Sequence, residues 1–258
     1  MKYKLARKIL MTIIAFNTLH AIEIKNSSHA VDVAGKQRMY TQRMLKDYAM
    51  LGMKNTYANA EGDLKKTVDD FDNHLISLLE YTQVADIKKK IKETQILWDP
   101  IKIMLSTVPS KEKAIELQTK LDALLKISNE TTMLFAKASG KQSGEIINIS
   151  GRQRMLSQRM ASLYMLKAWG VNDPKFKEKL DAATNKFNDS LKQLKESNLN
   201  TEEISKLLKD VEKSFIFFKI MNKSVSRFAP TLINKKSNII LKKMNTATGN
   251  YVAEEAKK

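Results

Sequence analysis

The stretch GKQRMYTQRM at residues 35–44 is found a second time in this chain, as GRQRMLSQRM at residues 151–160. The two copies are identical at seven of ten positions and lie 116 residues apart (151 minus 35). Outside these stretches the two halves have diverged widely, which argues against a recent duplication. The retained positions therefore indicate a role that the two copies share, within two equivalent modules.

Both copies are expected to be helical, because they lack proline, are rich in good helix formers and divide into an apolar and a polar side at about 100° per residue. We expect the apolar side to pack inward and the polar side to face away from the core. The apolar side comprises Val33, Tyr40, Met44, Tyr48 and Leu51 in the first copy and Ile149, Leu156, Met160 and Tyr164 in the second. The polar side comprises Gly35, Arg38, Gln42 and Lys46 in the first copy and Gly151, Arg154, Gln158 and Ser162 in the second, with Arg43 and Arg159 on the flank.

The polar side admits two interpretations. Its arginines are either solvated or paired with carboxylates of neighbouring helices, or they serve a ligand. A glycine one turn before an arginine lets another backbone or a small ligand come close, although it costs about 1 kcal/mol of helix propensity. The recurrence of the glycine, the glutamines and both arginines favours a shared role.

The extended stretches AGKQRMYTQRM and SGRQRMLSQRM resemble the signature helix of the N-terminal domain of PilJ-type chemotaxis transducers of type IV pili. They are more distantly similar to the periplasmic helix with which NarX/NarQ-type sensor kinases detect nitrate and nitrite. The resemblance implies an all-helical sensor module built as a four-helix bundle. In the nitrate sensors the anion lies between two such helices, held by an arginine from each and by backbone near the glycine. By position, the resemblance implies the ligand-binding pairs Gly35 with Arg38 and Gly151 with Arg154, with Arg43 and Arg159 as weaker candidates.

The first 21 residues are predicted to be a secretory signal peptide. Four basic residues precede the apolar run at residues 9–16, and Leu19-His20-Ala21 supplies a cleavage signal. An uncleaved membrane anchor is the alternative, but a span needs about 20 apolar residues and this run is much shorter. We therefore expect a periplasmic protein that is soluble or peripheral to the membrane.

The composition narrows the classes of partner. The chain has 45 Lys and Arg against 28 Asp and Glu, a net charge of +17, which favours anionic partners, although scattered solvated lysines account for much of the excess. Nucleic acid is not expected in an exported chain without a recognised binding motif. Because cysteine is absent, disulfides, a thiol nucleophile and attached haem are excluded.

No residue pattern predicts catalysis, a cofactor or a metal site. The three histidines, His20, His29 and His74, form no ligand spacing, and no nucleophile elbow, phosphate loop or paired-carboxylate arrangement stands out. Trp98 and Phe215 are expected to be core aromatics. We expect a protein that is not an enzyme.

The predicted fold is all-α, with two tandem antiparallel four-helix-bundle modules. The division is residues 1–21 for the signal peptide, 22–139 for the first module and 140–258 for the second. The helices of the first module are expected at residues 28–52, 57–81, 85–105 and 110–139, with Ser110 as an N-cap and with a bend or restart at Pro100. Gly140 and Gly144 mark the junction before the second signature helix at residues 145–169.

The leading functional hypothesis is an exported sensor that recognises a small anion, with nitrate or nitrite as the first candidate. Two arginines that approach each other repel, and a planar oxyanion between their rigid donor forks would offset this. Because neither a membrane helix nor a cytoplasmic signalling domain is expected in this sequence, a membrane-bound signalling protein is the expected partner. The alternative is a structural or interaction protein of the cell envelope, type IV pilus or chemotaxis system, with no small-molecule ligand.

The sequence leaves the pairing of the two signature helices open. They meet inside one chain as a pseudo-two-fold pair, or the modules stack end to end and each motif pairs with its copy in a homodimer.

Overall fold

The computed structural model describes residues 21–56, 58–140, 142–223 and 230–257, and the predicted signal peptide lies outside them except for Ala21. These ranges contain eight helices and no strand, which confirms the all-α prediction. The first half contains α1 (Ser27–Gly52), α2 (Ala60–Tyr81), α3 (Ala85–Leu105) and α4 (Lys111–Ala138). The second half contains α5 (Gln142–Trp169), α6 (Phe176–Lys195), α7 (Glu202–Lys223) and α8 (Pro230–Ala256).

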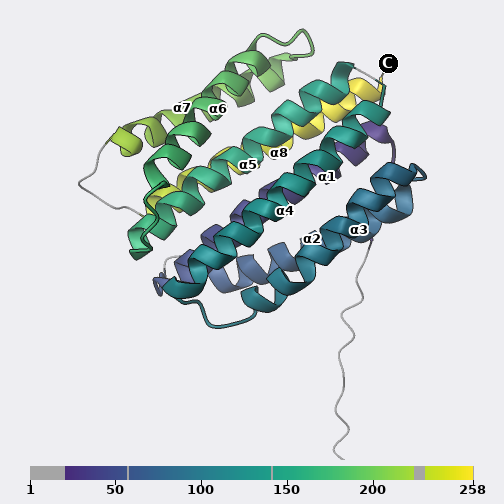
Figure 1. Ribbon diagram of the computed structural model, residues 1–258. Helices are drawn as coiled ribbons and strands as arrows, with labels where there is room; N and C mark the ends of the chain where they lie inside the picture. Colours follow the sequence, from purple (N-terminus) through teal and green to yellow (C-terminus); the bar gives the residue numbers. More distant parts are fainter. Residues whose placement is uncertain (1–20, 57, 141, 224–229, 258) are drawn as a thin grey trace, which may run out of the picture.

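The helices form two bundles of the same design, as predicted. In the first bundle α1 packs on α2 and α4, and α3 completes the group against α2 and α4. In the second bundle α5 packs on α6 and α8, and α7 closes it in the equivalent way. In Figure 1 the helices α4, α1, α5 and α8 occupy the middle of the molecule, with α2 and α3 on one side and α6 and α7 on the other.

The two signature helices pack along each other within one chain. Extensive contact joins α1 to α5, and smaller contacts join α1 to α8 and α4 to α5. The pair runs parallel, because Arg38 contacts Asn148 near the start of α5 while Tyr48 stacks edge-on against Trp169 at its end. The bundles therefore lie side by side about a pseudo-two-fold axis, and the end-to-end arrangement is not observed.

The apolar sides of the signature helices pack inward as expected, but the prediction that their polar sides face away from the core is wrong. Gly35, Arg38, Gln42 and Lys46 are all buried, and so are their equivalents in α5. The expectation assumed a helix with one covered side. Because α1 and α5 each lie between their own bundle and the other bundle, both of their sides are covered.

Local signals place the helix ends and one irregularity. Asn26 and Ser110 cap α1 and α4 by accepting hydrogen bonds from the main-chain N–H of His29 and Lys113. Helix α3 continues through Pro100 without the restart that the sequence analysis allowed. Pro100 lies on the exposed side of α3, where the carbonyl that its ring frees can be hydrated.

The first glutamine of each motif ties its helix to the next one in the bundle. The Gln37 amide donates to the main-chain carbonyl of Phe71 at 3.0 Å, and Gln153 donates to that of Phe187 at 2.9 Å. This repeated contact fixes α1 on α2 and α5 on α6 in the same register.

Trp98 and Phe215 lie in the core, as predicted. Phe71 stacks on Trp98 with ring centroids 4.4 Å apart, and the equivalent stack in the second bundle is 4.3 Å. The Trp98 indole also donates to the Asp72 carboxylate at 2.5 Å, and Lys102 pairs with the other carboxylate oxygen. Aromatic stacking and a polar contact thus join α2 to α3.

We expect Trp98→Phe to lower the free energy of unfolding by about 1 to 3 kcal/mol, because the buried Asp72 oxygen loses its donor. Phenylalanine is chosen because Phe215 occupies the equivalent place in the stack of the second bundle. Urea unfolding followed by circular dichroism would measure the change. Ile96→Ala, on the exposed side of the same helix, should change stability by less than about 0.5 kcal/mol. Equal midpoints for the two variants would contradict the prediction.

Candidate functional site

Arg38 of α1 and Arg154 of α5 meet at the contact between the two signature helices. Their side chains are 0% and 1% exposed. A Cβ atom at Gly35 would lie 3.3 Å from Nη2 of both arginines, and one at Gly151 would lie 3.0 Å from Nη2 of Arg154 and 3.3 Å from that of Arg38. Both guanidinium groups therefore lie against both glycines. Because glycine has no side chain, the two guanidinium groups can occupy this space.

Arg38 is bound by side-chain and main-chain amides. Its Nη1 donates to Oδ1 of Asn129 at 2.9 Å and to Oδ1 of Asn148 at 2.8 Å. Its Nη2 donates to the main-chain oxygen of Asn148 at 3.2 Å. One partner comes from the same bundle and the other from the opposite bundle, so Arg38 joins the two.

Arg154 makes the equivalent contacts with one chemical difference. It donates to Oδ1 of Asn245 and to the main-chain oxygen of Asp32, both at 3.3 Å, and it forms an ion pair with Oδ1 of Asp32 at 2.7 Å. Asn245 stands 116 residues after Asn129, and Asn148 stands 116 residues after Asp32. The two arginines thus have matching partners, except that a carboxylate on one side replaces an amide on the other.

The buried centre carries more positive than negative charge. Burial favours the neutral form of Asp32, but Arg154 and Lys36 outweigh it and hold the pKa of Asp32 at about 2. Among the described residues no carboxylate forms an ion pair with Arg38, and burial followed by the charges of Arg152 and Arg154 lowers the pKa of Arg38 to about 9. At neutral pH the centre therefore holds two charged guanidinium groups and one buried carboxylate, which pairs with Arg154. The Nε atoms of both arginines are buried and have no hydrogen-bond partner within the described ranges.

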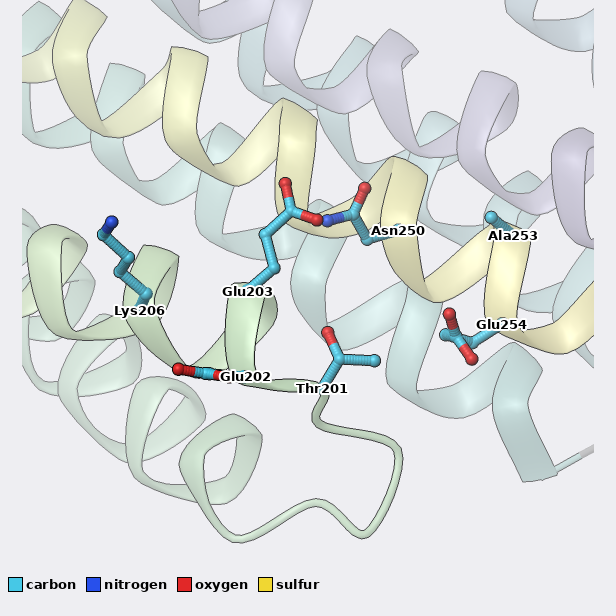
Figure 2. Close-up of a pocket in the computed structure, with 7 residues that line it drawn as sticks. All are labelled: Thr201, Glu202, Glu203, Lys206, Asn250, Ala253 and Glu254. Carbon is cyan, nitrogen blue, oxygen red and sulfur yellow. The ribbon is translucent and has the colours of Figure 1, made fainter.

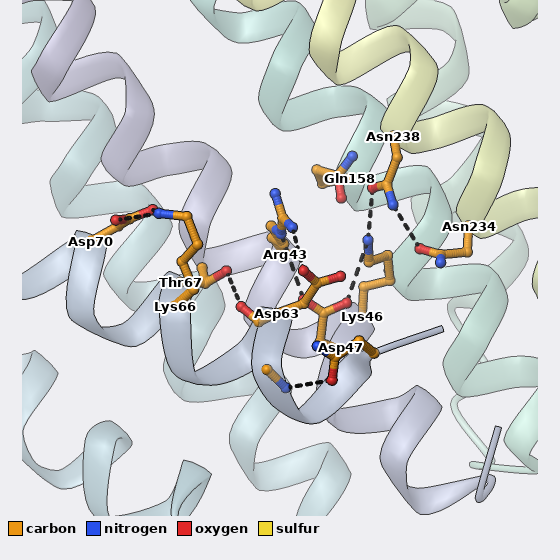
Figure 3. Close-up of polar contacts among 12 residues, drawn as sticks. Arg43, Lys46, Asp47, Asp63, Lys66, Thr67, Asp70, Gln158, Asn234 and Asn238 are labelled. Atoms are coloured by element: carbon orange, nitrogen blue, oxygen red, sulfur yellow. Dashed lines mark hydrogen bonds and ion pairs between the residues drawn. The ribbon is translucent and has the colours of Figure 1, made fainter. Parts of the chain in front are cut away.

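The structure does not place the second arginines of the motifs in this centre. Arg159 pairs with Asp122 at 2.7 Å. Arg43 pairs with Asp63 at 3.2 Å and approaches Asp47 at 3.6 Å, as Figure 3 shows. Both side chains are partly exposed and have a carboxylate partner, which matches the salt-bridge interpretation of these two positions.

A second buried polar layer surrounds Lys46, a residue whose role the sequence analysis did not identify. Its ammonium group is fully buried, donates to Oδ1 of Asn238 at 3.0 Å and lies 3.4 Å from Oδ1 of Asp47. Gln158 of α5, also labelled in Figure 3, donates to the main-chain oxygen of Ser237, the residue before Asn238, at 3.2 Å. Burial lowers the pKa of Lys46 and raises that of Asp47, and their mutual attraction opposes both shifts. This layer again joins α1 of one bundle to α8 of the other.

The sequence analysis missed the residues that hold the two central arginines, although the repeat contains a signal for them. Asn129 and Asn245 occur in the matching pattern Leu-Lys-x-x-Asn-x-x-Thr, at residues 125–132 and 241–248. Asp32 and Asn148 each stand three residues before the motif glycine, between two apolar residues. A comparison of the halves beyond the signature stretches would have identified these positions.

Other features of the described ranges are separate from this centre. An open hollow of about 570 Å³ lies between α7 and α8, and Figure 2 shows the side chains that line it. It is lined by Thr201, Glu202, Glu203, Lys206, Asn250, Ala253 and Glu254. None of the helices in the described ranges combines the length and apolar character that crossing a bilayer requires. The described side chains also form no group of three or more His, Cys, Asp or Glu that could hold a metal ion.

The described ranges form two side-by-side helical bundles, and the signature helices α1 and α5 lie at their contact. The family described as "Type IV pili methyl-accepting chemotaxis transducer N-term", or PilJ, matches residues 22–126 and 135–215. Each matched segment contains one signature stretch, consistent with tandem copies. The chain belongs to this family of sensor domains, which are typically non-catalytic and occur in signalling transducers. No curated protein and no solved structure matches the chain.

A buried histidine lies next to the arginine centre in the first bundle. His74 of α2 is 7% exposed and packs edge-on against Tyr40 of α1, with ring centroids 5.2 Å apart. Its Nδ1 is buried and has no hydrogen-bond partner in the described part of the chain. Burial, with a further contribution from Lys36, lowers the pKa of His74 to about 4 from 6.5. The folded protein therefore holds this imidazole in its neutral form at physiological pH.

The unfolded state should bind a proton at His74 between pH 4 and 6.5 that the folded state does not bind. The free energy of unfolding should consequently rise with pH across this window, by up to about 3 kcal/mol, and show no further contribution from His74 above it. Urea unfolding at pH 4.5 and pH 7 would measure the difference for the wild type and for His74→Ser, which carries the residue found at the equivalent Ser190. Taking the difference between the two pH values for each protein removes the loss of stability caused by the cavity in the variant, because that loss is the same at both pH values. Parallel pH profiles would contradict the prediction.

Proposed function

We propose that this protein is an exported periplasmic sensor domain that binds one small planar oxyanion, nitrate or nitrite first, between Arg38 and Arg154. The observation that carries the proposal is the buried Arg38 guanidinium, which forms no ion pair with a carboxylate in the described ranges and lies beside a second buried guanidinium. An uncompensated buried charge is strongly unfavourable. An anion bound between the two groups would offset both the burial and the mutual repulsion.

The chemistry of the centre supports a planar oxyanion as the ligand. A guanidinium group presents its donors in a rigid plane that matches two oxygens of such an anion. The unpartnered Nε atoms offer donors beyond those that the amides already occupy. Gly35 and Gly151 keep side chains out of this space, so a small ligand is favoured over a large one.

The position of the centre supports a role in signalling. Each arginine contacts residues of the opposite bundle, so a ligand held by both would act on the contact between α1 and α5. A ligand shifts a conformational equilibrium only through unequal affinity for its states. We propose that the anion favours one arrangement of the two bundles and that a membrane-bound signalling protein recognises this arrangement.

Export to the periplasm is proposed from the first 21 residues, whose basic start, apolar run and Ala21 form the pattern of a secretory signal. The excess of basic residues in the chain is compatible with this location and with a peripheral contact to anionic lipid.

A structural or interaction role without a ligand is the second candidate. The ion pair between Arg154 and Asp32 and the amide contacts of Arg38 favour it, because they occupy donors of both arginines with groups of the chain itself. This role predicts a stability that is indifferent to anions and sensitive to the loss of either arginine.

Thermal unfolding with nitrate, nitrite, chloride and sulfate at matched ionic strength tests the anion proposal. A ligand that binds only the folded state stabilises it by about 2.7 kcal/mol at a hundredfold excess over its dissociation constant. We expect a selective shift for nitrate or nitrite in the wild type and its loss in Arg38→Met, whose apolar side chain suits the buried position. Arg43→Met, in the same helix, should lose stability and keep the shift. Uniform curves for the wild type would favour the structural role.

A second test separates binding from stability. Gly151→Ala should stabilise α5 through helix propensity, by up to about 1 kcal/mol, while its Cβ displaces the Nη2 atoms of both arginines. We expect an unchanged or higher melting temperature together with weaker anion binding, measured by titration calorimetry. Gly249→Ala in α8 is the control, since its added Cβ would meet no atom within 4 Å and binding should be unaffected. Wild-type affinity in Gly151→Ala would contradict the location of the site.

A further inference from the structure

The pair Asp32 and Asn148 is where the pseudo-symmetry of the arginine centre breaks. These residues occupy equivalent positions on α1 and α5, and each contacts the arginine of the opposite bundle. Their exposed fractions are similar, at 7% and 9%. Their contacts with the arginines are also similar, at 2.7 Å from Asp32 to Arg154 and 2.8 Å from Asn148 to Arg38. The two sides therefore differ chiefly in charge.

We propose that Asp32 and Asn148 determine the charge class of the ligand, so that the centre accepts one monovalent oxyanion and rejects divalent ones. The inference rests on the proposed anion-binding function and assigns specificity to residues that the arginine motif does not include. One carboxylate between two guanidinium groups leaves one positive charge for the ligand to balance. Carboxylates at both residues 32 and 148 would balance both arginines and leave no excess charge. Amides at both residues would leave two positive charges unbalanced.

The next polar layer supports this assignment, because its charges balance. Three cations and three carboxylates of the described ranges occur in this layer, so neither sign is in excess there. The cations are Arg43, Lys46 and Arg159, and the carboxylates are Asp47, Asp63 and Asp122. Of these two layers, as far as the chain is described, that of Arg38 and Arg154 alone has an uncompensated charge.

Two further cations, Lys36 and Arg152, lie at the rim of the buried centre, and the charge of Arg152 reaches Arg38. Lys36 contacts Asp32 at 3.0 Å, but its side chain is 27% exposed, and its equivalent Arg152 is also only partly buried. Water screens such charges more effectively than it screens buried ones. The cost of desolvating an ion rises steeply with its charge in a low-dielectric site. A dianion would therefore need a second buried cation without a partner, and Asp32 removes it.

The asymmetry also places the ligand. Arg154 is already neutralised by Asp32, whereas the partners of Arg38 are the neutral amides of Asn129 and Asn148. The anion should therefore lie closer to Arg38 than to Arg154. Exchanging the aspartate and the asparagine should move it toward Arg154 without altering the total charge.

Titration calorimetry with nitrate, nitrite and sulfate on four proteins tests the proposal. The proteins are the wild type, Asn148→Asp, Asp32→Asn and the exchanged double variant Asp32→Asn with Asn148→Asp. We expect the wild type to bind nitrate or nitrite and not sulfate, and Asn148→Asp to lose at least tenfold in affinity. Asp32→Asn should bind sulfate. The double variant should recover binding of the monovalent anion to within about threefold of the wild type, which also shows that an aspartate at residue 148 is compatible with folding.

The outcomes separate this inference from the function on which it rests. If the wild type binds nitrate and Arg38→Met does not, while Asn148→Asp binds as the wild type does, the anion site stands and the charge assignment is wrong. If the wild type binds sulfate as tightly as nitrate, the charge assignment is likewise wrong and the anion site stands. If the wild type binds none of the three anions, the proposed function is overturned and the charge assignment with it.

Discussion

The structure depends on the contact between α1 and α5, which covers the polar sides of both signature helices and leaves only a narrow strip with partly exposed residues such as Lys36 and Arg43. Each helix packs on its own bundle through its apolar residues and on the other bundle through its polar ones. Covering a polar helix face leaves each buried donor and acceptor in need of a partner. The motif meets part of this need: the amides of Gln37 and Gln153 donate to the neighbouring helix, and Arg38 and Arg154 donate across the pseudo-two-fold axis, while the Nε atoms of both arginines have no partner in the described ranges.

The polar layers between the bundles differ in how completely they are satisfied. Around Lys46, Arg43 and Arg159 the charges are paired, and the layer serves to fix the register of the two bundles. Around Arg38 the hydrogen bonds are largely made but the charge is not balanced. Such an imbalance in a buried position is unfavourable for the protein alone, and it becomes favourable when an ion of opposite charge is present. The same contact can thus hold the bundles together and respond to a ligand.

Much of the fold could be predicted, because helix formers, caps such as Ser110 and a repeat at a fixed offset are local properties of the sequence. The core positions of Trp98 and Phe215 followed from the same reasoning. Burial of the polar side could not be predicted, since periodicity indicates which residues share a side but not how many neighbours a helix has. The motif singled out Arg38 and Arg154, which do meet. The equivalence of Asp32 and Asn148 can be read from the repeat, but their contacts with the arginines cannot, because each contact joins one helix to the other bundle and forms only in the folded chain.

Because both signature helices lie in one polypeptide, the contact between α1 and α5 can change in evolution in a way that a homodimer contact cannot. In a dimer of identical chains every substitution at the axis appears twice, so an aspartate at the position of Asp32 would face both arginines. When both copies lie in one polypeptide, each is encoded separately. A single substitution then changes only one of the two signature helices. Asp32 with asparagine at its equivalent residue 148, and Lys46 with serine at its equivalent residue 162, are differences that two identical chains cannot have. Tandem duplication therefore gives this interface access to odd numbers of charges, which symmetry denies to a homodimer.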